Sequence, residues 1–402
     1  MKILLLNLLY PPDGIGGSEK STQYLATGLH DLGHDVHVVA QAISEETVME
    51  NTNNVRVTRV GSPPGYQPNV FALPKEHIQA LKEAHSGDFI PFSESVAQII
   101  EDESPDIVHC NVVPRPGDIW NYCKRKKIPV VQTLRSYSIM CSARMIQGGR
   151  NCMSWCDPCR DQYKNRIDAS AHVDAVVGIS EHVLNTFLFN GFFSESRFAE
   201  VIPNSYHAER MSPLPVLGNR GECIMIGYLG RIHQSKGIET VLDAFARKTT
   251  SRLVLKIAGS GNPDYISYLT SKYRSEFISF VGYVDPQDFV NEIDVMCMPS
   301  TWHEPFGRVN IEAIAHGRPV IAAKRGGVTA IIKDGITGWH YEPYSVSQLS
   351  GIFSSIATMD PDQWESLFEN CLKDAHGYSV RAVAEAYEDL YYNLQYPQVT
   401  VN

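Results

Sequence analysis

Short runs of apolar residues alternate with amphipathic stretches along the first half of the chain. The runs are rich in branched residues and lack an alternating polar face, which is typical of strands buried on both faces of a parallel sheet. They predict strands at residues 3–9, 35–40, 55–60, 107–111, 130–134, 175–179 and 199–202. Apolar residues at helical spacing predict helices at 19–32 and 96–104. This alternation predicts a doubly wound α/β domain.

The same pattern restarts near residue 224. It predicts strands at 224–229, 253–258, 278–281, 295–299, 319–323 and 338–341, and helices at 237–246, 310–316 and 328–334. The polar, proline-containing stretch 203–222 predicts the connection between two domains. We therefore predict an N-terminal domain over residues 1–205 and a C-terminal domain over 206–379. A last amphipathic helix predicts that residues 380–402 pack back on the first domain.

Length and charge narrow the functional classes. The chain has 402 residues, 43% of them hydrophobic, and a single core stops growing near roughly 250 to 300 residues, which favours two folded domains. Asp and Glu number 45 against 35 Lys and Arg, giving a formal net charge of −10. An overall nucleic-acid-binding function is therefore not expected.

The apolar N-terminus predicts a strand rather than a signal peptide. Asn7 interrupts the apolar run, Pro11 and Pro12 follow it, and no small-residue cleavage site is present. No apolar stretch approaches the roughly 20 residues of a membrane span. The nine cysteines are odd in number and irregularly spaced, unlike a disulfide framework. We expect a cytoplasmic protein with reduced thiols.

The most specific motif is HEPFGRVNIEAIAHG at residues 303–317. Gly307 leads from a loop into a predicted helix, whose free amides can receive an anion such as phosphate. Glu304 lies on the loop and Glu312 lies within the helix. Either acid alone would suit a helix cap or an exposed helix face. Together they suit a ligand with hydroxyls at both ends and a diphosphate between them, such as a nucleotide-sugar.

This segment resembles the Glu-x7-Glu motif of the retaining GT-B glycosyltransferases of family 4. The similarity continues through GYLGR at 227–231, KG at 236–237, IAGSG at 257–261, VGYV at 281–284 and GGV at 326–328. It is looser in the first domain, at PP 11–12, the glycines at 14–17 and IPN at 202–204. The resemblance implies two Rossmann-like domains facing a central cleft, the second holding the donor and the first shaping the acceptor site.

The resemblance also assigns residues to the donor. It implies that Glu304 contacts the transferred sugar and that Glu312 holds the ribose hydroxyls. The remaining donor contacts it implies are Phe306, Gly307, Arg308, Val309, Gly259, Gly261, Tyr283, Val284, Gly16 and Gly17.

Arg231 and Lys236 follow the first strand of the second domain. Such cations suit a diphosphate, because the guanidinium of Arg can donate two parallel hydrogen bonds to it and the ammonium of Lys supplies a compact positive charge. A solvated pair at a helix N-terminus is the alternative, although cations are unfavourable there without an anion. The resemblance gives them the catalytic task of stabilising the departing nucleoside diphosphate, which a metal ion performs in other transferases. We therefore expect no cofactor for catalysis.

The glycine-rich loop at 13–18 also suits a phosphate or sugar near backbone amides. Its spacing is not the G-x-G-x-x-G of dinucleotide-binding dehydrogenases, and no acidic residue clearly ends the second strand. A dehydrogenase is therefore disfavoured.

The chain departs from the family at Arg135, Ser136 and Tyr137, where His-Asp usually follows the strand. Arginine stays protonated and cannot act as a base. In the front-face mechanism proposed for the family, the leaving phosphate oxygen takes the acceptor proton, so the change need not abolish transfer. We expect sugar or acceptor contacts at these three residues. His109 is either a further contact or a structural hydrogen-bonding group.

Cys141, Cys152, Cys156 and Cys159 follow this departure. The last two have zinc-knuckle spacing, and four thiolates would complete a tetrahedral structural zinc site. The alternative is a set of reduced, partly buried thiols.

The basic run at 124–127 ends a predicted helix. It suits either the negative end of the helix dipole or contact with anionic lipid headgroups at the inner face of the membrane.

The resemblance implies a retaining, metal-independent transferase. It would move a hexose-type sugar from a UDP- or GDP-type donor to a glycan or lipid-linked oligosaccharide, in cell-surface polysaccharide synthesis. A sugar-nucleotide epimerase or hydrolase is one alternative. The other is an inactive protein that binds nucleotide-sugars or glycans.

Overall fold

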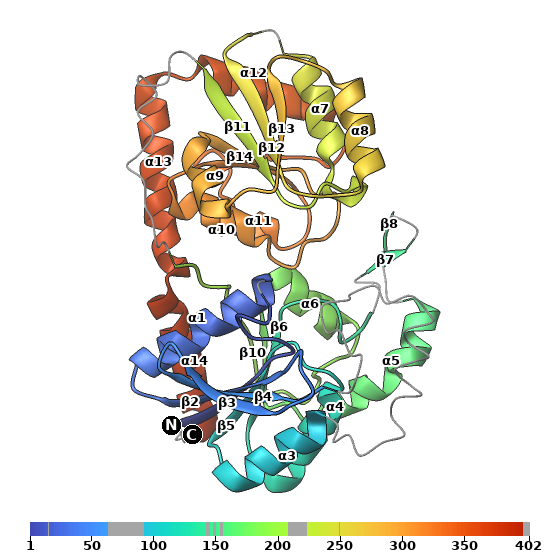
Figure 1. The fold of residues 1–402 in the computed structure, drawn as a ribbon, viewed down its shortest axis with the longest axis vertical. Coiled ribbons are helices and arrows are strands. Elements are labelled where there is room, and N and C mark those ends of the chain that lie inside the picture. The colour runs from blue at the N-terminus through green and yellow to red at the C-terminus, as the bar shows by residue number, and fades with distance from the viewer. Residues whose placement is uncertain are drawn as a thin grey trace, which may run out of the picture. The chain divides into compact units, whose positions relative to one another are not determined.

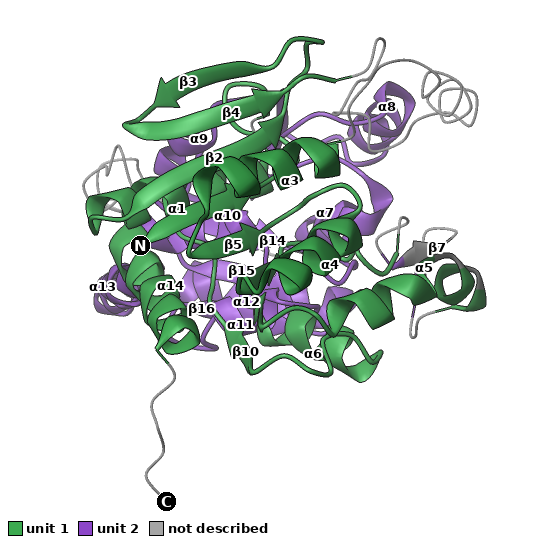
Figure 2. Cartoon of the chain, turned by 90° about the horizontal axis from the view of Figure 1, so that it is seen from below, with its two compact units in different colours: residues 1–144, 154–205, 380–402 green, residues 145–153, 206–379 purple. Residues whose placement is uncertain are grey.

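The computed structural model describes residues 1–14, 16–62, 92–141, 145–147, 150–152, 156–207, 223–248 and 250–396 (Figure 1). The chain divides into two compact units, coloured separately in Figure 2. Unit 1 contains residues 1–144, 154–205 and 380–402, and unit 2 contains residues 145–153 and 206–379. Each unit is built on its own sheet and core, so each is described separately.

Unit 1 is built on an eight-stranded sheet with the order β10-β9-β6-β5-β1-β2-β4-β3. All neighbouring strands run parallel except β3 and β4, which are antiparallel. The strands are β1 (Lys2–Leu6), β2 (Asp35–Gln41), β3 (Val48–Thr52), β4 (Val55–Val60), β5 (Ile107–Cys110), β6 (Val130–Leu134), β9 (Ala175–Gly178) and β10 (Phe198–Val201).

Unit 1 contains six helices among its described residues. They are α1 (Gly17–Asp31), α3 (Phe92–Glu103), α4 (Pro116–Lys126), α5 (Asp157–Ser170), α6 (Glu181–Phe189) and α14 (Val380–Gln395). The last helix packs against α1, where a Cβ placed on Gly28 would lie 2.8 Å from the Cβ of Ala384. Its residues Val383, Tyr387 and Leu390 belong to the same buried core as the central strands.

The β3–β4 hairpin is a feature that the sequence pattern did not predict. Asn53 and Asn54 form its turn with φ of 51° and 62°, the left-handed pair that suits a two-residue hairpin. β3 is an edge strand, and Met49 is 73% exposed. An exposed edge strand buries neither face, so it lacks the apolar run that identifies the inner strands.

Unit 2 is built on a six-stranded, all-parallel sheet with the order β13-β12-β11-β14-β15-β16. The strands are β11 (Ile224–Leu229), β12 (Leu253–Ala258), β13 (Ile278–Gly282), β14 (Val295–Met298), β15 (Val320–Ala323) and β16 (Gly338–Tyr341). The helices are α7 (Ile238–Ala246), α8 (Pro263–Lys272), α9 (Pro286–Glu292), α10 (Arg308–Ala315), α11 (Val328–Ile331), α12 (Val346–Thr358) and α13 (Pro361–Ala375). Short 3-10 turns lie at Gln234–Lys236 and His376–Tyr378.

Several further elements of unit 2 were not predicted, among them helices α8 and α9. A small antiparallel hairpin pairs β7 (Ile146–Gln147) with β8 (Arg150–Asn151). Helices α12 and α13 contribute Phe353, Trp364 and Phe368 to the core of unit 2. With these additions, the predicted doubly wound α/β class is confirmed for both units.

Candidate functional site

The strand order of unit 2 reverses between β11 and β14. In open α/β sheets, ligands bind beyond the carboxyl ends of the strands at such a reversal. The loop after β11 carries Arg231 and Lys236, and the loop after β14 carries Glu304 and leads into α10. The residues with the most specific sequence pattern therefore lie on the two loops where a ligand is expected.

Backbone contacts hold these two loops together. The amides of Thr301 and Trp302 donate to the carbonyl oxygen of Ser235 at 3.1 and 3.2 Å. A Cβ placed on Gly237, which has φ of 69°, would lie 2.0 Å from the carbonyl oxygen of Pro299. The close approach requires glycine at this position and fixes Lys236 beside the β14 loop.

Glu304 and Lys236 form an ion pair in this setting. Lys236 Nζ pairs with Glu304 Oε1, and Ser300 Oγ donates to the same carboxylate oxygen at 3.0 Å. The two charged side chains are 19% and 9% exposed, respectively. The ring of Trp302 lies under Lys236, with Nζ 5.3 Å from its centroid. A nearly buried pair in which each charge neutralises the other is suited to exchange partners when an anionic ligand enters.

Ser300 and Trp302 were not identified from the sequence. The signal for Ser300 is its position directly beyond a buried strand and four residues before an acid. No pattern in one sequence distinguishes Trp302 from an ordinary core aromatic. Arg231 was identified, and its side chain is exposed while its carbonyl oxygen accepts a 2.8 Å hydrogen bond from Tyr228 Oη.

Glu312 lies on the second turn of α10, beside the start of the helix. Arg308 Nε donates to Glu312 Oε1 at 3.0 Å, and the two side chains are 13% and 16% exposed. Gly307 is the N-cap of the helix with φ of 80° and, as a glycine, has no side chain with which to cap the first amides. Val309 is half-buried, whereas Phe306 is 4% exposed and packs against Tyr378. The helix start therefore presents amides, an arginine and a carboxylate within one turn of each other.

The carboxyl ends of β12 and β13 carry the other predicted donor residues. A Cβ placed on Gly259 would lie 1.8 Å from the carbonyl oxygen of Gly230, and one on Gly261 would lie 2.2 Å from that of Ile232. These glycines bring β12 into backbone contact with the loop of Arg231. Tyr283 follows β13 and is 76% exposed, and Val284 is half-buried.

Replacing Gly259 by Ala is expected to lower the free energy of unfolding by about 3 kcal/mol. The new Cβ would meet the carbonyl of Gly230, and Gly259 has φ of 137°, where L-residues are strained. Gly282→Ala is the matched control, because Gly282 has φ of 74° with nothing within 4 Å of its Cβ position. Urea unfolding of both variants is the measurement. An equal loss in both would contradict the packing role of Gly259.

Polar side chains at the carboxyl ends of the unit 1 strands converge on Arg135. Its Nε donates to Asn111 Oδ1 at 2.7 Å, and Nη1 donates to Asn204 Oδ1. Burial raises the pKa of Glu19, and its own backbone amide and the charge of Arg135 oppose that rise. Glu19 lies against the glycine-rich loop, with Oε2 2.4 Å from the Cβ position of Gly16.

The other residues predicted near Arg135 have different environments. Ser136 is half-buried and its Oγ donates a hydrogen bond to Ser138 Oγ at 2.9 Å. Tyr137 is 1% exposed, and its carbonyl oxygen accepts from two following amides. Gly16 and Gly17 are exposed. Glu19 was not identified from the sequence, although an acid directly after a glycine-rich helix start is a usable signal.

His109 is fully buried and belongs to a structural network. Its Nδ1 lies 2.6 Å from Tyr391 Oη and its Nε2 lies 2.7 Å from Thr133 Oγ1, which also contacts Tyr387 Oη at 2.9 Å. Burial, with a smaller contribution from Arg135, holds the pKa of His109 well below its usual value. Of the two sequence interpretations, the structure favours the structural hydrogen-bonding group, which ties α14 to β5 and β6.

This lowered pKa predicts acid sensitivity. Below about pH 6.5 the unfolded chain binds the His109 proton more readily than the folded protein does, so this contribution to stability is lost as pH falls. A single such group changes the free energy of unfolding by about 1.4 kcal/mol per pH unit. Urea unfolding between pH 7 and 5 should therefore show a shallower slope for His109→Gln than for the wild type. Equal slopes would contradict this role.

The cysteines divide between the two units. Cys159 Sγ lies 3.5 Å from Cys141 Sγ, and burial, with the neighbouring thiols of Cys141 and Cys156, raises the pKa of Cys159 to about 12. Cys152 belongs to unit 2. Across the described ranges, no three His, Cys, Asp or Glu side chains are arranged to hold a metal ion. Structural zinc at these four cysteines stays a prediction.

The basic run at 124–127 ends α4, as expected for a helix C-terminus. Lys126 Nζ pairs with Glu101 Oε1, and Arg125 lies 5.6 Å from the centroid of the Tyr122 ring. In the part of the chain that the structure describes, no helix has both the length and the apolar character needed to cross a bilayer.

Each half of the chain matches a known protein family. Residues 16–205 match the family described as glycosyl transferase 4-like domain. Residues 215–365 match the family described as glycosyl transferases group 1. Together these segments contain every residue of the candidate site in unit 2 and the glycine-rich loop residues Gly16 and Gly17.

Two curated relatives align along most of the chain. The uncharacterized 42.6 kDa protein in the cps region of Klebsiella pneumoniae is 28% identical over 339 residues, covering 82% of this chain and 87% of the relative. Glycogen synthase of Mycobacterium tuberculosis (strain CDC 1551 / Oshkosh) is 26% identical over 377 residues, covering 89% and 86%.

A solved structure shares the fold. Anabaena Alr3699/HepE in complex with UDP-glucose superposes with a TM-score of 0.69 at 18% identity, covering 97% of this chain and 99% of the other. At this identity the likeness concerns the fold alone. The predicted GT-B class is confirmed by such structural neighbours.

Proposed function

Because the chain belongs to the glycosyltransferases, we propose that it transfers a sugar from a nucleoside diphosphate donor to a glycan or lipid-linked oligosaccharide. Its membership follows from the glycosyl transferase 4-like domain at residues 16–205 and the glycosyl transferases group 1 domain at residues 215–365. The observation that carries this proposal is the Lys236–Glu304 pair beside the start of α10, where the N-cap is Gly307. It combines groups for a diphosphate with a carboxylate for a sugar hydroxyl.

In this proposal, the diphosphate replaces Glu304 as the partner of Lys236. The helix amides and Arg231 share the negative charge of the diphosphate. The carboxylate of Glu304, released from Lys236 and still held by Ser300, then accepts hydrogen bonds from hydroxyls of the transferred sugar. This exchange of partners couples donor binding to the placement of the sugar.

Glu312 is proposed to accept hydrogen bonds from the ribose hydroxyls. Arg308 is hydrogen-bonded to Glu312 and keeps its carboxylate beside the helix start. Tyr283, which is exposed, and Val284 follow β13 and are proposed to lie along the nucleoside. The UDP-glucose bound by the Anabaena protein supports a donor of the UDP type.

The transfer is proposed to proceed with retention and without a metal ion. The bond between the anomeric carbon and the phosphate oxygen breaks, and a bond from that carbon to the acceptor oxygen forms on the same face. The departing phosphate oxygen takes the acceptor proton, so no side-chain base is required. Lys236 and Arg231 supply the positive charge that stabilises the departing diphosphate.

We place this activity in the cytoplasm, at the inner face of the membrane, in the synthesis of a cell-surface polysaccharide. The relative in the cps region of Klebsiella pneumoniae and the relatedness to a glycogen synthase support a glycan product. Lys124 and Lys127, which are exposed at the end of α4, are the residues proposed to contact anionic headgroups.

The donor is identified by isothermal titration calorimetry against a panel of UDP-, GDP- and ADP-sugars. We expect micromolar affinity for one nucleotide class and at least about tenfold weaker binding of the others. Binding of none of them would overturn the proposed donor site. An epimerase converts the selected donor to an isomer without acceptor, whereas a transferase leaves its sugar configuration unchanged.

A further inference from the structure

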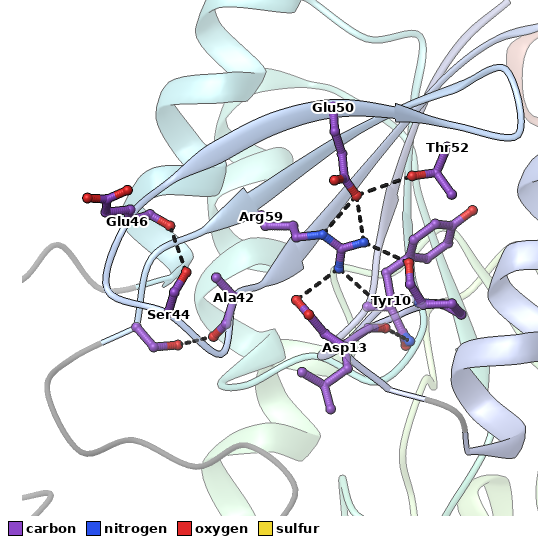
Figure 3. Close-up of polar contacts among 12 residues, drawn as sticks. Tyr10, Asp13, Ala42, Ser44, Glu46, Glu50, Thr52 and Arg59 are labelled. Carbon is purple, nitrogen blue, oxygen red and sulfur yellow. Dashed lines mark hydrogen bonds and ion pairs between the residues drawn. The ribbon is translucent and has the colours of Figure 1, made fainter.

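Arg59, on β4, is 6% exposed although it carries a guanidinium group. Its Nη1 donates to the carbonyl oxygen of Tyr10 at 2.7 Å and to Asp13 Oδ2 at 3.1 Å, and its Nη2 donates to the carbonyl oxygen of Pro11 at 2.7 Å (Figure 3). These acceptors belong to one segment, the connection between β1 and the glycine-rich loop. Arg59 therefore binds that connection from the side, across the sheet.

The other edge of the guanidinium, formed by Nε and Nη2, is hydrogen-bonded to Glu50 in the β3–β4 hairpin. Nε and Nη2 both donate to Glu50 Oε1, at 2.9 and 2.7 Å, and Thr52 Oγ1 donates to the same oxygen at 3.2 Å (Figure 3). Glu50 is on β3, so the edge strand that the sequence pattern did not predict supplies the counter-charge. A buried guanidinium is stable only when its donors are satisfied and its charge is balanced, and here both conditions hold.

The segment held by Arg59 sets the position of the glycine-rich loop. Tyr10 and Asp13 close a turn, with the Asp13 amide donating to the Tyr10 carbonyl oxygen at 3.1 Å. Gly14 follows at once and is buried against Leu9 and Glu19, whereas Gly16 and Gly17 are exposed. The segment that Arg59 binds therefore lies only a few residues before the exposed Gly16 and Gly17.

Arg56, the other arginine on β4, has different ion-pair partners and is more exposed. Its Nη2 lies 2.8 Å from Glu103 Oε2 and 3.7 Å from Asp35 Oδ1, and its side chain is 42% exposed. None of these contacts reaches the β1 connection. The two arginines differ in burial and in partners, and only Arg59 binds backbone carbonyls of the segment that leads into the glycine-rich loop.

We propose that Arg59 is a positioning residue that pre-orders the glycine-rich loop for an anionic group of the substrate. Without it, the loop must be ordered when the ligand binds, and that ordering reduces affinity. The kinetic consequence rests on the proposed function, because it requires a nucleotide-sugar donor that approaches the amides of Gly16 and Gly17. The ordering of the loop is independent of that function.

Hydrogen–deuterium exchange of the full chain tests the ordering directly. Exchange in peptides spanning residues 8–18 is measured for the wild type, Arg59→Met, Arg59→Lys and Arg56→Met. We expect at least about tenfold faster exchange in Arg59→Met and the wild-type rate in Arg56→Met. Arg59→Lys should exchange at an intermediate rate, because lysine keeps the positive charge but lacks the planar guanidinium with its several donors. Unchanged exchange in Arg59→Met, in protein with wild-type circular dichroism, would overturn the proposal.

Steady-state kinetics then tests the consequence. With the donor selected by calorimetry, we expect KM for the donor to rise about tenfold in Arg59→Met while kcat changes by less than about twofold. A merely structural loss would reduce the amount of active enzyme and lower kcat at unchanged KM, and that pattern would overturn the positioning role. A wild-type protein that transfers no sugar would refute the proposed function, and the exchange data would still decide the role of Arg59.

Discussion

Replacing Glu304 by Gln is expected to lower kcat by about 100-fold or more and to leave the dissociation constant of the donor within about threefold of the wild-type value. A preorganised charge that acts on the reacting sugar is worth about that factor in other enzymes. Donor binding changes little because the diphosphate binds Lys236, and Glu304 competes with it for that cation. The substitution removes the competition together with the catalytic carboxylate.

Initial rates at saturating donor and calorimetry on the same preparations separate these two effects. Glu292→Gln is the matched control, because Glu292 also pairs with a lysine, Lys256, but is 55% exposed on α9. We expect it to keep wild-type kcat. Wild-type turnover in Glu304→Gln would refute the role of Glu304, and a large loss of donor affinity at unchanged kcat would assign it to binding alone.

Replacing Glu312 by Gln is expected to raise the dissociation constant of the donor and of the free nucleoside diphosphate by about 10- to 100-fold. Hydrogen bonds to a charged group contribute about 1.5 to 3 kcal/mol, which corresponds to this range. At saturating donor, kcat should stay within about threefold of the wild type. The loss of affinity should be equal for the donor and for the nucleoside diphosphate product, because both contain the ribose.

The control for this variant is Glu385→Gln on α14. Arg381 Nε donates to Glu385 Oε1 at 2.7 Å at the same four-residue helical spacing as the Arg308–Glu312 pair, but at an exposed position. We expect it to bind the donor with wild-type affinity. If Glu312→Gln bound the free nucleoside diphosphate as tightly as this control, the ribose assignment would be wrong.

The buried strands were predictable because a parallel sheet covered on both faces demands continuous apolar runs. The end of β1 was less well predicted, since residues 3–9 were expected and the strand ends at Leu6. The apolar run continues, but the buried side chain of Asn7 donates to the Leu9 carbonyl oxygen at 2.7 Å and accepts from Val112 N at 3.1 Å. A side chain that bonds to neighbouring loops ends the strand where hydrophobicity alone does not.

Helices α12 and α13 had usable signals that the apolar pattern alone did not include. Ser345 accepts from Gln348 N, and Asp360 forms a capping box with Gln363, two local features that mark helix starts. The predicted connection at 203–222 lies largely outside the described residues, which resume at 223.

The residues of the candidate site could be identified from local sequence patterns, but the pairing of Lys236 with Glu304 could not. The spacing of Glu304 and Glu312 and the Lys-Gly at 236–237 are local patterns that one sequence carries. That Lys236 is paired with Glu304, 68 residues away, depends on the order of β11 and β14 in the sheet. Likewise, the bond from Arg59 to Tyr10 joins residues 49 apart. Such contacts follow from topology, which no local pattern specifies.

Release of nucleoside diphosphate from the donor that calorimetry selects is the most direct test of sugar transfer that depends on Glu304. The rate is measured for the wild type and Glu304→Gln, with and without glycan and lipid-linked oligosaccharide fractions. We predict that acceptor accelerates release by the wild type at least about tenfold and that Glu304→Gln loses nearly all of this acceleration. Release at the same rate without acceptor would indicate a hydrolase, and binding without release would indicate an inactive binding protein; either result would contradict a glycosyltransferase that acts through Glu304.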